Sequence, residues 1–246
     1  MRRSYALPGA GARQHGRVIS VDWRAVGGDV AAFLLAASCA GCDEPGILLC
    51  PSCARELAPT PREVETPQGL RVRAALSFDG VPARCIRRFK GEGETLLARP
   101  LGAALAAVLA PVVSSSTWVV PVPTSGRAFR ARGYRVPEML VRRAGSPPQR
   151  VLALRARTAD QRGLGVGERA LNVRDSMGAR QSGGGAEAVL VDDVVTTGAT
   201  FDEAARALSA AGFHVVAAVA LAATPRHAGF GGDSSETHRR HDETRP

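Results

Sequence analysis

One segment, residues 188–200, constrains the fold of this chain more than any other. It reads Ala-Val-Leu-Val-Asp-Asp-Val-Val-Thr-Thr-Gly-Ala-Thr. A short, valine-rich apolar run of this kind is typical of a buried strand in a parallel sheet. Residues 201–211 then show the apolar period of a helix. The segment therefore predicts a strand that ends at two adjacent carboxylates, followed by a polar loop and a helix N-terminus.

The polar groups of this segment suit a sugar phosphate. The loop offers free backbone N–H groups, threonine hydroxyls and the partial positive charge of a helix N-terminus, which together bind a phosphate monoester. Asp192 and Asp193 would repel a phosphate but can accept hydrogen bonds from two neighbouring ribose hydroxyls. We therefore expect a site for ribose 5-phosphate, in which Gly198 lets the backbone approach the phosphate closely. The alternative is an ordinary strand, acidic turn and threonine-capped helix. The predicted phosphate loop is Thr196, Thr197, Gly198, Ala199 and Thr200.

Four of the five cysteines form two C-x-x-C pairs separated by seven residues. Two such pairs supply four thiolates for a tetrahedral metal ion, and four thiolates leave no open position for catalysis. We therefore expect a small structural zinc knuckle; two disulfides or a redox-active C-x-x-C are the alternatives, and both fit a cytoplasmic chain poorly. The fifth cysteine, Cys85, lies in a basic stretch and is interpreted as a small filler residue. The expected zinc ligands are Cys39, Cys42, Cys50 and Cys53.

Residues 188–200 resemble the phosphoribosyl-pyrophosphate (PRPP) signature of type I phosphoribosyltransferases. With the four cysteines, the chain resembles the ComF-type phosphoribosyltransferases over about residues 30–223. That family is named for a bacterial competence protein required for DNA uptake in some species. The resemblance implies a type I phosphoribosyltransferase-like α/β fold, a parallel sheet with helices on both faces, and the small N-terminal zinc knuckle with its four cysteines.

The implied activity is displacement of pyrophosphate from C1 of PRPP by an unidentified nitrogen acceptor. Mg²⁺ would be held mainly by PRPP, and Zn²⁺ would be structural. A rival interpretation is a non-catalytic protein that senses PRPP or a nucleotide, or that binds single-stranded DNA or a helicase partner. The scarcity of aromatic residues, 4% of the chain, argues against stacking on bases.

Further cations match the resemblance. The stretch Pro-Val-Pro at 121–123, followed by Arg127, Arg130 and Arg132, corresponds to the family's pyrophosphate loop, and clustered arginines suit a diphosphate. The alternative is a solvated basic helix face. Lys90, the only lysine among 32 lysine and arginine residues, lies in another matching stretch and is a candidate ligand. The family commonly shows Arg-Gly-Phe-Asn-Gln after the pyrophosphate loop, whereas this chain reads Arg-Gly-Tyr-Arg-Val at 132–136, with Tyr134 in place of the phenylalanine. This difference puts transfer to the family's acceptor in doubt.

The polar segment around residues 155–172 matches the family's flexible loop, which closes over the ligand and excludes water. Its candidate residues are Arg157, Gln161 and Arg169, and its glycines would allow movement. A plain surface loop is the alternative.

The chain divides into four predicted parts: a disordered 1–28, a helix and knuckle at 29–60, a phosphoribosyltransferase domain at 61–223, and a disordered tail at 224–246. Apolar patterns predict strands at 70–79, 118–123, 188–191 and 214–221, with a further short strand at 151–154, and helices at 96–109, 137–143 and 201–211. This alternation of strands and helices predicts a parallel sheet; residues 59–69 are interpreted as a linker. The longest apolar run near the N-terminus is too short to span a membrane, so we expect a cytoplasmic protein. The net charge of +9 favours an anionic partner, although a coding bias towards arginine explains it equally well.

Overall fold

The computed structural model describes residues 38–155 and 175–225. The disorder expected at 1–28 and the start of the helix and knuckle expected at 29–60 lie outside the described residues, as does the tail expected to be disordered at 224–246 except for its first two residues. Of these two, Thr224 donates its N–H to the carbonyl of Val195 at 3.0 Å. A five-stranded sheet forms the centre of the molecule, in the order β1-β2-β7-β6-β3, and all neighbours except β1 and β2 are parallel. The strands are β1 (Arg62–Glu65), β2 (Arg71–Ser77), β3 (Trp118–Pro121), β6 (Glu187–Val195) and β7 (His214–Ala223).

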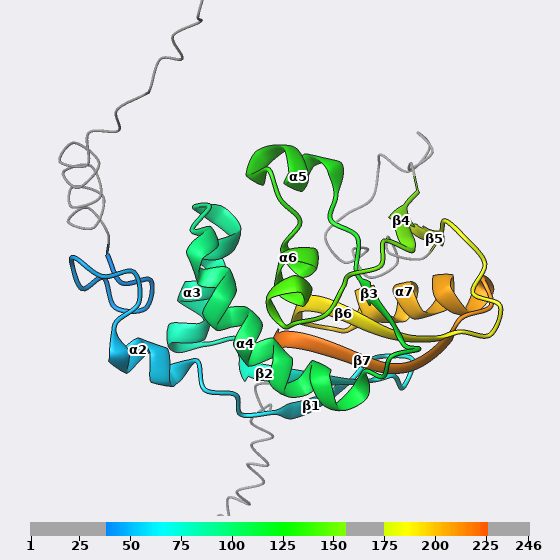
Figure 1. Ribbon diagram of the computed structural model, residues 1–246, viewed down its shortest axis with the longest axis horizontal. Coiled ribbons are helices and arrows are strands. Elements are labelled where there is room, and N and C mark those ends of the chain that lie inside the picture. The colour runs from blue at the N-terminus through cyan, green and yellow to red at the C-terminus, as the bar shows by residue number, and fades with distance from the viewer. Residues whose placement is uncertain (1–37, 156–174, 226–246) are drawn as a thin grey trace, which may run out of the picture.

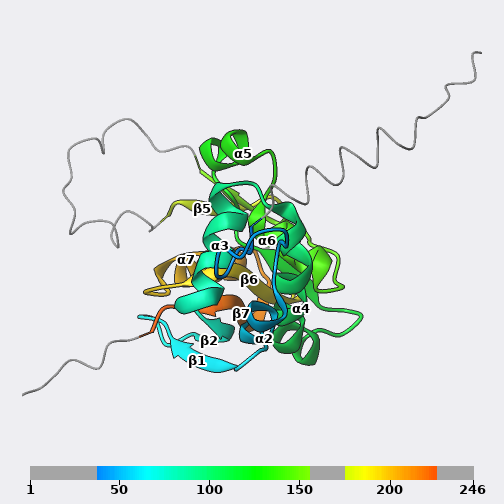
Figure 2. The ribbon, with the colours of Figure 1, turned by 90° about the vertical axis from the view of Figure 1, so that its left-hand side faces the viewer.

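Helices cover both faces of this sheet, as predicted. One face packs against α3 (Gly80–Gly91), α4 (Ala98–Leu109) and α6 (Val136–Arg143), and the other against α7 (Ala199–Ala210). Figure 2 shows α4 and α7 on opposite sides of β6 and β7. Because both faces are covered, β3, the first half of β6 and the second half of β7 are mostly buried and read as continuous apolar runs. In β6, residues 188–191 are fully buried.

One helical stretch among the described residues, Thr95–Val112, is long and apolar enough to cross a membrane by length and composition alone. It comprises η1 (Thr95–Leu97), α4 and η2 (Ala110–Val112). Leu101, Leu105 and Val108 of α4 are fully buried in the core cluster on this face of the sheet. Its apolar character is therefore used in packing on the sheet.

Smaller elements lie around this core (Figure 1). The helix α2 (Pro51–Glu56) follows the cysteine pairs, and α5 (Gly126–Arg132) projects from the body after β3. The strands β4 (Leu152–Leu154) and β5 (Met177–Ala179) form a separate antiparallel pair, whose Leu152 and Met177 pack in the core cluster with α7.

Several boundaries differ from those expected. The predicted linker contains β1, whose exposed charged residues suit the edge of a sheet. The strand β6 continues through Asp192 and Asp193 to Val195, and α7 begins at Ala199 instead of residue 201. The helix α3 is not among the predicted elements, although its buried positions Pro82, Ile86 and Phe89 follow a helical period.

Candidate functional site

The polar segments gather at one edge of the sheet. Because β2, β3 and β6 are parallel, their carboxyl ends meet at the same edge. There β2 leads to α3, β3 leads to α5, and β6 leads to residues 196–198 and α7. Ligands of open α/β sheets bind outside this edge. The topology thus brings together segments that carry Lys90, the three arginines and the acidic pair.

The acidic pair forms the centre of this edge. Asp192 and Asp193 are half-buried, and the N–H of Asp193 donates to Oδ1 of Asp192 at 2.8 Å. Lys90, in the last turn of α3, places Nζ 3.0 Å from Oδ1 of Asp193. The structure therefore brings together Lys90 and Asp193, two of the predicted site residues that lie 103 positions apart.

Burial raises the pKa of Asp192 to about 8, and the negative charge of Asp193 acts in the same direction. The N–H of Asp193 and the ammonium of Lys90 oppose this shift. At neutral pH the Asp192 carboxyl is therefore largely protonated.

The helix that carries Lys90 is fixed from two directions. The hydroxyl of Tyr134 donates to the carbonyl of Phe89, and the two rings stack with centroids 5.5 Å apart. On its other side, Arg88 forms ion pairs with Asp43 and Glu94. In the sequence, Tyr134 is notable only as a substitution in the family's Arg-Gly-Phe-Asn-Gln pattern, and no local signal predicts its contact with α3.

The predicted phosphate loop precedes an uncapped helix. Gly198 is the N-cap of α7 and has no side-chain cap bond; its φ of 86° requires glycine. Within residues 38–155 and 175–225, no protein group accepts a hydrogen bond from the N–H of Thr200 or Phe201. Free N–H groups at a helix N-terminus attract anions. Thr196 and Thr197 are exposed beside them.

The three candidate arginines lie on α5, which projects from the body (Figure 1). Arg127 and Arg130 are exposed, and Arg132 is half-buried. None of the three forms an ion pair with any other described residue. This helix therefore presents unpaired positive charge after the carboxyl end of β3.

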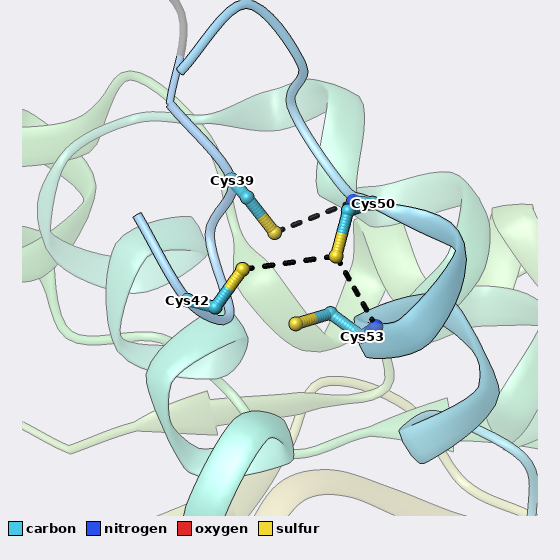
Figure 3. Close-up of side chains that lie close together, drawn as sticks. All are labelled: Cys39, Cys42, Cys50 and Cys53. Carbon is cyan, nitrogen blue, oxygen red and sulfur yellow. Dashed lines mark hydrogen bonds between the residues drawn. The ribbon is translucent and has the colours of Figure 1, made fainter. Parts of the chain in front are cut away.

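The four paired cysteines converge, with their sulfur atoms facing one another (Figure 3). These four sulfurs lie within 4.8 Å of one another, and Sγ of Cys42 is 3.7 Å from Sγ of Cys50. A tetrahedral ion with metal–sulfur bonds near 2.3 Å needs sulfurs about 3.8 Å apart, whereas a disulfide needs about 2.05 Å. The geometry fits a metal ion, and all the cysteines are free thiols.

Backbone groups favour the thiolate form of Cys39, whereas the pKa values of Cys42 and Cys53 are raised. Burial opposes ionisation of Cys39, but the N–H groups of Cys50 and Gly41 point at its sulfur, at 3.3 and 3.4 Å, and its pKa falls to about 6. The cluster also packs on α3 through Val81. The fifth cysteine, Cys85, is fully buried in the core, which agrees with its interpretation as a filler.

The predicted flexible-loop residues Arg157, Gln161 and Arg169 lie outside the described residues. The chain on either side of them is well fixed. The N–H of Arg155 donates to the carbonyl of Ser176 at 2.8 Å, and the N–H of Met177 donates to the buried carboxylate of Glu203 in α7 at 2.8 Å. The two ends of the segment are thus paired and attached to α7.

No family model matches the chain, and no curated protein matches it. Among solved structures, orotate phosphoribosyltransferase from Aeropyrum pernix is similar over 70% of this chain and 79% of its own, with 19% identity and a TM-score of 0.32. Adenine phosphoribosyltransferase from Rhodothermus marinus is similar over 69% and 85%, with 18% identity and a TM-score of 0.32. The enzyme of the same name from Leishmania donovani is similar over 70% and 68%, with 15% identity and a TM-score of 0.34.

Proposed function

We propose that this protein is a PRPP-dependent phosphoribosyltransferase of the ComF type. One observation carries the proposal: a half-buried acidic pair and an uncapped helix N-terminus follow each other at the carboxyl edge of a parallel sheet, joined by residues 196–198. Acids suit the hydroxyls of a ribose, and free N–H groups suit its 5-phosphate.

In this proposal each group has one role. Asp192 and Asp193 accept hydrogen bonds from the ribose hydroxyls, and residues 196–200 bind the 5-phosphate. The unpaired arginines of α5 and the ammonium of Lys90 bind the pyrophosphate. These positive charges stabilise the pyrophosphate most strongly where water is excluded, and the planar guanidinium group of arginine can donate two parallel hydrogen bonds to phosphate oxygens.

The reaction forms a bond between C1 of the ribose and a nitrogen of the acceptor as the bond from C1 to the pyrophosphate oxygen breaks. The electron pair of that bond leaves with pyrophosphate, and positive charge develops on the ribose ring. The protein's contribution is to position the reactants and to stabilise the charge on the leaving group. Bound with PRPP, Mg²⁺ supplies further positive charge to the pyrophosphate.

The four cysteines hold a structural Zn²⁺ in the same proposal. A cytoplasmic location agrees with reduced thiolates. Among the described residues, the apolar side chains packed against the four cysteines are Ile47, Leu49 and Val81, and a metal ion would supply further stability to this small knuckle.

The test is release of pyrophosphate from PRPP and Mg²⁺ with a panel of nucleobases and small amines. We expect at least one acceptor to support release. Lys90→Met should slow that release by about tenfold or more, because a charged hydrogen bond to the leaving group is lost. Arg99→Met, which removes an exposed cation from α4, is the matched control and should leave the rate unchanged.

Absence of release with every acceptor would contradict the catalytic proposal. Salt-sensitive binding of single-stranded DNA in that case would favour the DNA- or helicase-binding alternative and a link to DNA uptake.

A further inference from the structure

A buried threonine with no role in the proposed reaction lies where β1 ends. Thr66 is 5% exposed and is one of four buried polar or charged side chains in the described part of the chain. Its hydroxyl donates to Oδ1 of Asp202 at 2.5 Å and accepts from the N–H of Leu70 at 3.0 Å. Because the hydroxyl both donates and accepts, its orientation is fixed.

The partner of this hydroxyl belongs to the first turn of α7. The N–H of Asp202 donates to the carbonyl of Gly198 at 3.0 Å, which closes that turn. The other carboxylate oxygen of Asp202 accepts from the N–H of Gln68 at 3.2 Å. The turn between β1 and β2 therefore holds the start of α7 through both oxygens of one carboxylate.

The same threonine also packs against the N-cap of α7. A Cβ on Gly198 would lie 2.6 Å from Cγ2 of Thr66 and 3.0 Å from its Cα. The backbone of Gly198 thus lies so close to Thr66 that a residue with a Cβ would clash there. The absence of a Cβ at Gly198 therefore serves the contact with Thr66 as well as the expected approach of a phosphate.

We propose that Thr66 is a positioning residue for the phosphate loop: its hydroxyl and methyl groups fix the N-terminal turn of α7 so that the free N–H groups of Thr200 and Phe201 converge on a phosphate monoester. The inference rests on the proposed function, because it concerns the same loop. Thr66 and Gln68 also donate hydrogen bonds to both oxygens of the Asp202 carboxylate, which weaken its repulsion of the phosphate without removing its charge.

The test is calorimetric titration of the full chain with ribose 5-phosphate. Thr66→Val keeps the shape and removes the hydroxyl, and we expect roughly tenfold weaker binding, the effect of one lost hydrogen bond to a charged group. Thr66→Ser, which keeps the hydroxyl and loses only the methyl, should bind ribose 5-phosphate more tightly than Thr66→Val. Thr117→Val is the matched control: Thr117 is 8% exposed, its hydroxyl bonds Ser114 before the amino end of β3, and its loss should not change affinity.

A second variant, Asp202→Ala, distinguishes the structural support of the α7 N-terminus from electrostatic repulsion of the phosphate. Charge alone predicts tighter phosphate binding, since a carboxylate is removed, whereas loss of support predicts weaker binding. Wild-type affinity in Thr66→Val, or tighter binding in Asp202→Ala, would overturn the inference and leave the proposed function intact. Absence of ribose 5-phosphate binding in the wild-type protein would overturn both.

Discussion

At the scale of single residues, Asp192 of the acidic pair resists ionisation. The pKa of Asp192 rises from 3.8 to about 8, chiefly through burial. Between these two pH values the folded protein binds the additional proton, so the stability that this carboxyl contributes is complete below about pH 4 and is lost as the pH rises through about 8.

Asp192→Asn should therefore stabilise the protein at high pH only. An amide resembles the protonated carboxyl and cannot ionise. We expect the variant to unfold at the wild-type temperature near pH 4 and at least about 2 °C above it near pH 9. Thermal unfolding followed by circular dichroism measures the difference. A difference of the same size at all pH values would contradict the assignment.

Sequence alone identifies residues whose chemistry is local. The acids at 192 and 193 and the four cysteines form contiguous or closely spaced patterns, and the structure brings the four cysteines together as predicted. The partners of Lys90 and Thr66 are 103 and 136 positions away. Nothing near either residue in the sequence specifies such a contact, because it depends on how the sheet assembles.

At the scale of elements, the cysteine knuckle and α3 form one structural unit. Val81 packs against the cluster, and Arg88 bonds Oγ of Ser38 at 3.1 Å and pairs with Asp43. Lys90 lies half a turn further along the same helix. A disordered knuckle would therefore loosen the helix that carries a proposed pyrophosphate ligand.

Loss of one thiolate should remove the metal ion. Cys39→Ser is expected to reduce bound zinc from about one equivalent to well below that and to lower the unfolding temperature, since the knuckle depends on the ion. Elemental analysis of the purified protein measures the metal. Cys85→Ser, outside the cluster, is the control and should retain the zinc; a wild-type protein without bound metal would refute the zinc proposal.

The elements that were predicted are those with long apolar patterns: β2, β3, β6, β7, α4, α6 and α7. The short strand β1 was interpreted as a linker because only one of its four residues, Val64, is apolar and buried, and prolines flank it. Its strand conformation is determined by pairing with β2. The helix α3 was missed because its exposed face is dense in arginine and no side chain caps its N-terminus.

At the scale of the whole molecule, the acidic pair, Lys90 and the arginine-bearing helix α5 all belong to segments at or after the carboxyl ends of parallel strands. Lys90 faces the pair from α3, and the unpaired arginines of α5 follow β3. An anion such as PRPP would meet donors from three chain segments there, while its ribose meets the acids. This arrangement is the central claim of the proposed function.

Calorimetric titration with PRPP and Mg²⁺ tests that claim most directly. We predict saturable heat with one ligand per chain for the wild-type protein and none for Asp192→Ala/Asp193→Ala, because alanine leaves the ribose hydroxyls without acceptors. No heat from the wild-type protein, or equal heat from the double variant, would contradict it.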